Sequence, residues 1–139
     1  MTDHQHDGRR LLPEWHPQWG ILLAWPDEHT DWAGRLPSAR HTYLALIKAL
    51  LDHQAVLLVC RDSDAAETAR TLTDDSGADS RRLRIRIADY NDTWARDFGP
   101  IGVQENGAPV LLDFHFTGWG GKFESALDDR LNRALPWRV

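Results

Sequence analysis

The alternation of short apolar runs with helix-like segments is the feature that most limits how this chain can fold. Residues 20–25, ending in ILLAW, and residues 55–60, AVLLVC, are apolar nearly throughout, which is typical of strands buried on both faces. Amphipathic segments at residues 38–53 and 64–75 follow these two runs and indicate helices. Apolar strands separated by helices predict an α/β fold in which helices pack on the sheet.

Polar residues and proline indicate where these helices begin and end. Ser38 follows a proline-bounded loop at residues 26–37 and is expected to cap the first helix. Asp64 and Glu67 have the spacing of a capping box at the start of the second helix, and Gly77 is its expected stop. The buried face of the first helix is predicted to carry Tyr43, Leu44, Ile47, Leu50 and Leu51.

Strand patterns dominate the second half of the chain. Residues 83–87 alternate leucine or isoleucine with arginine, which predicts a strand with one solvent-facing side. Residues 101–104 and 109–116 are expected to pair through a hairpin at Asn106-Gly107. The stretch TGWGGK lacks the spacing of a phosphate loop and is expected to form a tight turn. A last helix is expected around three leucines spaced by four residues, Leu127, Leu131 and Leu135. The sheets are expected to be mixed.

Length and composition indicate one soluble globular unit. The chain has 139 residues, of which 42% are hydrophobic and 27% charged, enough for one core and too few for two ordinary domains. We expect a polar tail at residues 1–12 and a folded segment at residues 13–139. The net charge of -5 argues against nucleic acid as a partner, because phosphate binding requires a basic face.

Cysteine usage and hydropathy bear on the compartment. Cys60 is the single cysteine, so no internal disulfide is possible, and the polar start has no apolar core of a signal peptide. A cytoplasmic location is therefore expected. No apolar run approaches the ~20 residues of a membrane span, and no histidine has metal-ligand spacing with another histidine or a cysteine. We expect neither membrane association, nor a metal, nor a cofactor.

The candidate site is the stretch NDTWARDFGP at residues 91–100, directly after the strand at residues 83–87. Ligands of α/β sheets collect at the carboxyl ends of strands. A carboxylate can accept two parallel N–H bonds from a guanidinium while an indole lies against its plane, and Asp97 and Trp94 could supply that pair. The alternative is structural: Arg96 pairs with a local acid, Trp94 belongs to the core, and the polar residues before it shape a turn.

Three motifs resemble a known family. PEWHPQWGILLAWP, NDTWARDFGPI and LLDFHFTGWGGK, in this order, are similar to the amino-terminal part of the agmatine deiminase family, which includes bacterial peptidyl-arginine deiminases. The similarity runs over residues 9–135. It implies the pentein fold, in which five ββαβ-type units surround a central active site like propeller blades. A chain of this length can hold the first part of that ring.

The resemblance also implies a reaction and two site residues. The family hydrolyses a guanidinium to a ureido group with loss of ammonia, through a covalent thiouronium intermediate on cysteine. By resemblance, Asp97 is a carboxylate that holds the guanidinium and Trp94 is a wall of the substrate pocket. The matching residues Asn91, Asp92 and Arg96 are interpreted as loop architecture.

The family's nucleophile, its histidine and a further acid have no counterpart here and are expected downstream. Cys60 ends an apolar strand, so we interpret it as a buried structural thiol. We therefore predict a fragment that is inactive alone, acts on a small cationic guanidinium substrate as part of an enzyme, and can self-associate through unpaired strand edges. Two alternatives stay open: arginine or peptidyl-arginine as the substrate, and a truncated, non-catalytic binding or assembly module.

Overall fold

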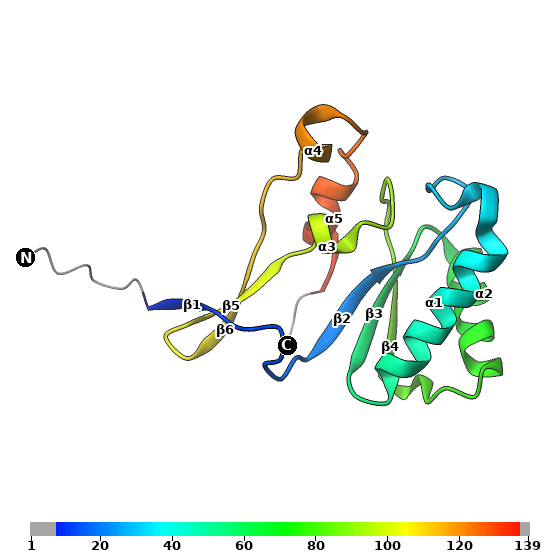
Figure 1. Cartoon of the computed structure of the whole chain (residues 1–139), viewed down its shortest axis with the longest axis horizontal. Coiled ribbons are helices and arrows are strands. Elements are labelled where there is room, and N and C mark those ends of the chain that lie inside the picture. The colour runs from blue at the N-terminus through cyan, green and yellow to red at the C-terminus, as the bar shows by residue number, and fades with distance from the viewer. Residues whose placement is uncertain (1–7, 137–139) are drawn as a thin grey trace, which may run out of the picture.

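The computed structural model describes residues 8–136 of the chain, shown in Figure 1. Residues 1–7 of the expected polar tail lie outside this range. Two separate three-stranded sheets form, one parallel and one antiparallel, so the predicted mixture of strand directions is realised as two sheets. The strands are β1 (Arg9–Leu11), β2 (Gly20–Ala24), β3 (Ala55–Cys60), β4 (Leu83–Ile87), β5 (Ile101–Glu105) and β6 (Ala108–Leu112). The α-helices are α1 (Leu36–Leu51), α2 (Ser63–Asp75), α3 (Ala95–Phe98), α4 (Gly118–Gly121) and α5 (Asp128–Ala134).

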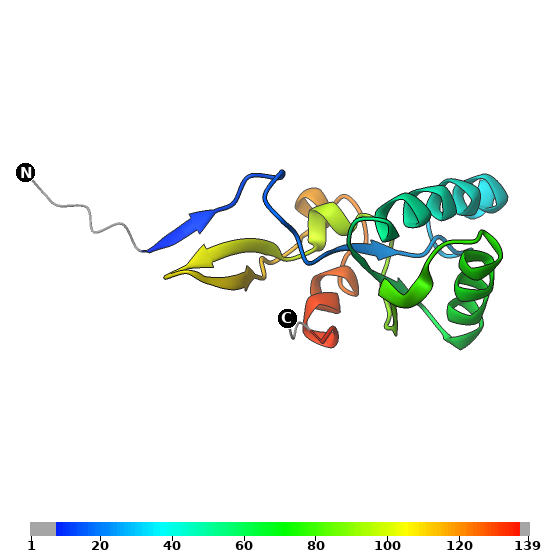
Figure 2. The same cartoon turned by 90° about the horizontal axis from the view of Figure 1, so that it is seen from below.

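The parallel sheet has the strand order β2-β3-β4, with β3 in the centre. It is wound as β2-α1-β3-α2-β4, which is the alternation that the apolar runs predicted. Figures 1 and 2 show α1 and α2 on one side of this sheet and α5 on the other. Because both faces are covered, the central strand is buried along almost its whole length.

Successive side chains of β3 enter two different cores. Val56, Leu58 and Cys60 pack with the apolar faces of α1 and α2, in a cluster that includes Trp25. Leu57 and Val59 point to the opposite face and pack in a second cluster, which includes Tyr90, Phe98 and Leu131. Because side chains alternate between the two faces of a strand, β3 packs against the helices on one face and against the segment after β4 on the other.

The antiparallel sheet has the order β1-β5-β6. The predicted hairpin at Asn106-Gly107 is confirmed, with φ angles of 50° and 86° that suit a tight two-residue turn. Strand β6 ends at Leu112, earlier than the predicted 116. Strand β1 was not predicted, because its residues fall in the expected polar tail; all three are exposed, and they pair with β5 through their backbones.

Both predicted helix caps were wrong. Helix α1 begins at Leu36 and places Pro37 in its first turn, where the missing N–H of proline is not needed, so Ser38 lies inside the helix. Helix α2 is capped by Asp62, whose side chain accepts a hydrogen bond from the Ala65 N–H at 2.8 Å, two residues before the predicted cap. Asp62 has the extended backbone conformation of a cap, so its carboxylate can reach the free N–H groups of the first helical turn.

The predicted alternation of β4 needs correction at the end of the strand. Ile87 at the end of β4 is 58% exposed although the alternation placed it inside. The last helix is confirmed as α5, and the predicted Leu131 and Leu135 are buried at 1% and 6% exposure, the latter just past the helix end; α5 also buries two polar residues, Asp128 and Asn132. The stretch TGWGGK forms the expected turn, with Trp119 at φ 57° between glycines that also have positive φ.

Candidate functional site

The segment after β4 is shaped by short-range contacts. Helix α3 has a single turn, which starts after Trp94 and closes with the Gly99 N–H donating to the Ala95 carbonyl at 2.8 Å. A Cβ at Gly99 would collide with that carbonyl oxygen, so the position requires glycine. Pro100 follows and prevents the helix from continuing. This turn places Asp97 and Trp94 on the same short element.

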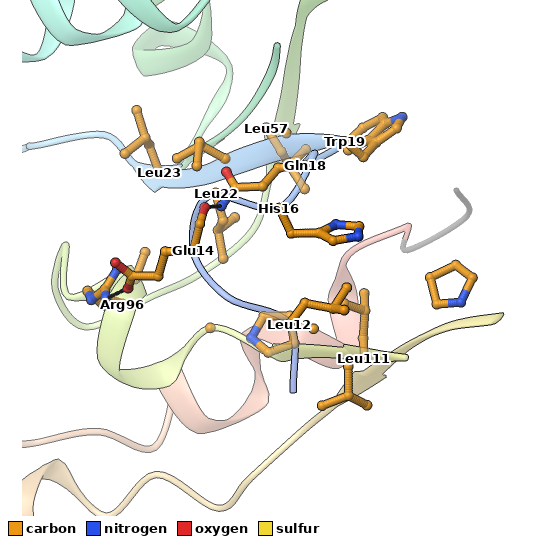
Figure 3. Close-up of a pocket in the computed structure, with 18 of the residues that line it drawn as sticks. Leu12, Glu14, His16, Gln18, Trp19, Leu22, Leu23, Leu57, Arg96 and Leu111 are labelled. Atoms are coloured by element: carbon orange, nitrogen blue, oxygen red, sulfur yellow. Dashed lines mark hydrogen bonds and ion pairs between the residues drawn. The ribbon is translucent and has the colours of Figure 1, made fainter. Parts of the chain in front are cut away.

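Asp97 and Trp94 both line an open groove of about 920 Å³. Its walls are largely apolar: Leu22 and Leu57 come from the parallel sheet and Leu111 from β6, as Figure 3 shows. A groove with apolar walls and a few charged groups is the usual form of a small-molecule site. The structure therefore brings both predicted site residues to one groove.

Trp94 is not a core residue, so the structural alternative was wrong on this point. Its side chain is 43% exposed. The ring of Trp94 meets Trp119 edge to face at a centroid distance of 5.7 Å, and Trp119 packs in turn on Phe116 and Phe123. Aromatic neighbours fix the plane of an indole while its free surface stays available to a ligand.

Arg96 and Asp92 have contacts of a structural kind. Arg96 forms an exposed ion pair with Glu14, a residue 82 positions away in sequence (Figure 3). Asp92 accepts hydrogen bonds from the Asp31 N–H at 3.0 Å and from the Thr93 N–H at 2.7 Å. The negative charge of Asp92 raises the pKa of Asp31 above its usual value. These contacts agree with the interpretation of both residues as loop architecture.

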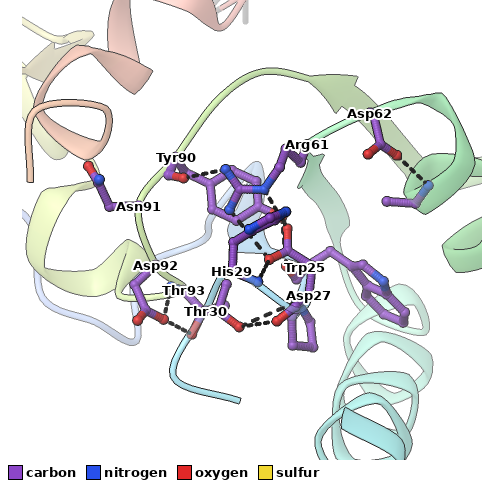
Figure 4. Close-up of polar contacts among 12 residues, drawn as sticks. Trp25, Asp27, His29, Thr30, Arg61, Asp62, Tyr90, Asn91, Asp92 and Thr93 are labelled. Atoms are coloured by element: carbon purple, nitrogen blue, oxygen red, sulfur yellow. Dashed lines mark hydrogen bonds and ion pairs between the residues drawn. The ribbon is translucent and has the colours of Figure 1, made fainter. Parts of the chain in front are cut away.

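A buried polar cluster supports the same end of the parallel sheet (Figure 4). Asp27, Arg61 and Tyr90 follow β2, β3 and β4, respectively. Arg61 donates to the Asp27 carboxylate at 2.8 Å and to the Tyr90 carbonyl at 2.8 Å, and the Tyr90 hydroxyl donates to the Trp25 carbonyl at 2.7 Å. Burial raises the pKa of Asp27, but the bonds from Arg61 and the His29 N–H outweigh it and lower the pKa overall.

Sequence reasoning missed two polar residues of α5 beneath the site, Asp128 and Asn132. They are 2% and 4% exposed. Burial raises the pKa of Asp128 to about 6, although hydrogen bonds from the Asn91 and Asp92 N–H groups act in the opposite direction. Their spacing of four residues beside Leu131 was the available signal, since it places both on the apolar face of the helix.

Cys60 is fully buried, as expected of a structural thiol. Burial, with smaller effects from Asp62 and Asp27, raises the pKa of this thiol to about 12. A thiol with that pKa is not a nucleophile at neutral pH. Within residues 8–136, no group of three or more histidine, cysteine or acidic side chains is placed to hold a metal ion. No helix in the same range is long and apolar enough to cross a membrane.

The fold is that of the pentein deiminases. A structure of Campylobacter jejuni agmatine deiminase with substrate bound superposes with a TM-score of 0.80 at 34% sequence identity, over 90% of this chain and 35% of that one. The model of the Porphyromonas-type peptidyl-arginine deiminase family matches residues 10–138, and the chain belongs to this family.

Curated relatives point to the same family. Agmatine deiminase of Pseudomonas aeruginosa is 30% identical over 133 residues, and that of Stutzerimonas stutzeri is 30% identical over 119 residues. These matches cover 95% and 85% of this chain, respectively. The chain spans about a third of the length of these relatives, 33% and 31%. Agmatine deiminase of Enterococcus faecalis, at 24% identity and a TM-score of 0.75, shares the fold.

Proposed function

We propose that residues 13–139 are the amino-terminal portion of a pentein deiminase that hydrolyses agmatine to N-carbamoylputrescine and ammonia. The observation that carries the proposal is that Asp97 and Trp94 line one open groove in a chain of a deiminase family. The name of the matching family model favours peptidyl-arginine, whereas the curated relatives cited above are agmatine deiminases. We choose agmatine because both of these relatives and the substrate-bound structure at a TM-score of 0.80 are agmatine deiminases.

The chemistry of the groove suits a guanidinium. The Asp97 carboxylate can accept two parallel N–H bonds from this planar cation, and charge-assisted bonds of this kind are about twice as strong as neutral ones. The exposed face of Trp94 can lie against the cation, an arrangement worth ~0.5–2 kcal/mol. Together these contacts would hold the guanidinium carbon in one position, which is what nucleophilic attack requires.

The reacting groups would come from outside this chain. A cysteine thiolate adds to the guanidinium carbon. A histidine then protonates one terminal nitrogen, and the C–N bond to it breaks so that this nitrogen leaves as ammonia. Water then cleaves the C–S bond, giving the ureido product and the free thiolate. Cys60 cannot take this role, because it is buried and its pKa is raised to about 12.

The test is a substrate comparison with the complete gene product that contains residues 1–139. Agmatine, free arginine and an arginine peptide are incubated separately, and ammonia and ureido products are measured. We expect turnover of agmatine, no turnover by residues 1–139 alone, and normal turnover in Cys60→Ser. Preference for an arginine peptide would overturn the proposed substrate. Absence of turnover with all three would favour the non-catalytic module instead.

A further inference from the structure

One face of α5 contacts residues 91–98, the site segment, near both ends of that segment. Asp128 and Asn132 are one helical turn apart and almost fully buried, and Leu131 between them packs in the same apolar cluster as Phe98. Neither polar residue lines the groove that contains Trp94. Buried polar side chains are costly unless they form specific hydrogen bonds, so their bonds indicate what they do.

At the amino end of the segment the hydrogen bonds are reciprocal. The Asp128 carboxylate accepts the Asn91 N–H at 2.7 Å and the Asp92 N–H at 3.3 Å. In return, the Asn91 side-chain oxygen accepts the Leu127 N–H at 2.8 Å and the Asp128 N–H at 3.2 Å. Asn91 thereby caps the start of α5, a role that a side chain usually plays within its own helix. Four bonds join two segments that lie 37 positions apart in sequence.

At the carboxyl end of the segment, Asn132 holds the last residue of α3. Its side-chain nitrogen donates to the Phe98 carbonyl at 2.8 Å and to the Asp113 carboxylate at 2.7 Å. The ring of Phe98 is 2% exposed and packs against Phe116. Trp94 and Asp97 lie between the two attachment points, so their backbone is fixed from both sides.

We propose that Asp128 and Asn132, the α5 clamp, are positioning residues that hold the segment from Asn91 to Phe98 so that Trp94 and Asp97 meet the substrate in one geometry. The inference rests on the proposed function of Asp97. A displacement of about 1 Å in such a site can reduce turnover on the order of 100-fold, although the clamp itself touches no substrate. The α5 clamp is thus distinct from residues that bind the guanidinium.

The test uses Asp128→Ala in the complete gene product, with Asp129→Ala as a matched control. Asp129 is the next residue of α5, and its carboxylate bonds the Phe116 N–H at 2.7 Å and the His115 ring at 2.9 Å, both of which lie outside residues 91–98. We expect Asp128→Ala to lower kcat for agmatine on the order of 100-fold with a smaller change in KM. We expect Asp129→Ala to leave both constants near wild type at a comparable melting temperature.

Rescue and hydrogen exchange separate positioning from general stability. Asp128→Asn keeps an acceptor oxygen at the same place, so we expect it to recover turnover to within about tenfold of wild type. In Asp128→Ala the Asn91 and Asp92 amides should exchange at least about tenfold faster, while amides of β3 stay protected. Unchanged kcat and unchanged exchange at these two amides would overturn the proposal, as would an equal loss of kcat in Asp129→Ala.

If Asp128→Ala does not fold, Asn132→Ala carries the kinetic measurement, because it removes the bond to the Phe98 carbonyl, and the clamp fails if kcat for agmatine stays near wild type. If the wild-type protein turns over no guanidinium substrate, the proposed function fails. Exchange alone then supports the clamp if protection of Asn91 and Asp92 is lost, and refutes it if protection is kept.

Discussion

Asp92 and Asp97 are five residues apart, and their carboxylates have different surroundings. The Asp92 carboxylate accepts hydrogen bonds from the N–H groups of Asp31 and Thr93, so replacing this residue disturbs the loop. Asp97 is exposed and lines the groove. Under the proposed function, only Asp97 has its carboxylate available to a cationic ligand.

Asp97→Asn in the complete gene product should keep the fold and lose activity. The replacement is nearly isosteric, but it exchanges charge-assisted hydrogen bonds for neutral ones and allows the guanidinium carbon to move. We expect kcat/KM for agmatine to fall on the order of 100-fold, equivalent to about 3 kcal/mol. Steady-state kinetics measure the loss, and melting temperature checks the fold.

Asp92→Asn is the control for this prediction. It should change stability more than turnover, because the carboxylate holds backbone N–H groups of its own loop. Near-normal turnover in Asp97→Asn, or a larger loss in Asp92→Asn at equal stability, would contradict the assignment of the guanidinium to Asp97.

Among individual residues, the sequence singled out exposed candidates more readily than buried ones. The resemblance singled out Asp97 and Trp94, and the structure brings both to one groove. Asp128 and Asn132 were missed because their burial depends on partners more than 30 positions away, at Asn91 and Phe98. No local pattern shows that a polar residue on a helix will find such a partner.

At the scale of elements, helix α2 shows how structure corrects a local rule. The capping-box spacing favoured Asp64, but the chain leaves β3 in an extended conformation and brings Asp62 over the first turn. Asp62 has extended backbone angles, φ -146° and ψ 179°, as caps do, whereas Asp64 is already helical. The positions of β2 and β3 were predicted correctly within a residue, because continuous apolar runs are decided by burial and not by end effects.

Asp62→Ala and Asp64→Ala therefore form a matched pair. Asp62→Ala should destabilise the protein by ~1 kcal/mol, because the Ala65 N–H loses its acceptor at 2.8 Å. Asp64→Ala should cost a few tenths of a kcal/mol, through loss of a negative charge near the helix amino end. Urea unfolding of both variants measures the difference, and equal losses, or a larger loss in Asp64→Ala, would contradict the assignment of the cap.

At the scale of the whole molecule, large apolar side chains are exposed around the sheets of this chain. Trp15 is 88% exposed, Trp19 55% and Ile87 58%. Strand β4 is an edge of the parallel sheet and ends in one of these residues. Open edges and apolar surface both promote association between chains.

Residues 1–139 in isolation should therefore self-associate with increasing concentration, as the sequence suggested. A lysine on an exposed strand edge opposes pairing, so Ile87→Lys should reduce the apparent mass. Thr68→Lys adds the same charge on the exposed side of α2 and should leave association unchanged. Light scattering over a concentration series measures both effects; a monomer at every concentration would refute the prediction.

The hydrogen bonds between Asn91 and Asp128 also hold together the two ends of a long excursion of the chain, residues 99–127. Residues 99–127 leave the site segment, form the β5–β6 hairpin and return to α5. Once both ends of such an excursion are held, adding residues at its tip costs little, because closure entropy grows slowly with length. Evolution can therefore lengthen or rewrite the tip at Asn106-Gly107 to recruit new neighbours, while the geometry around Asp97 is inherited unchanged.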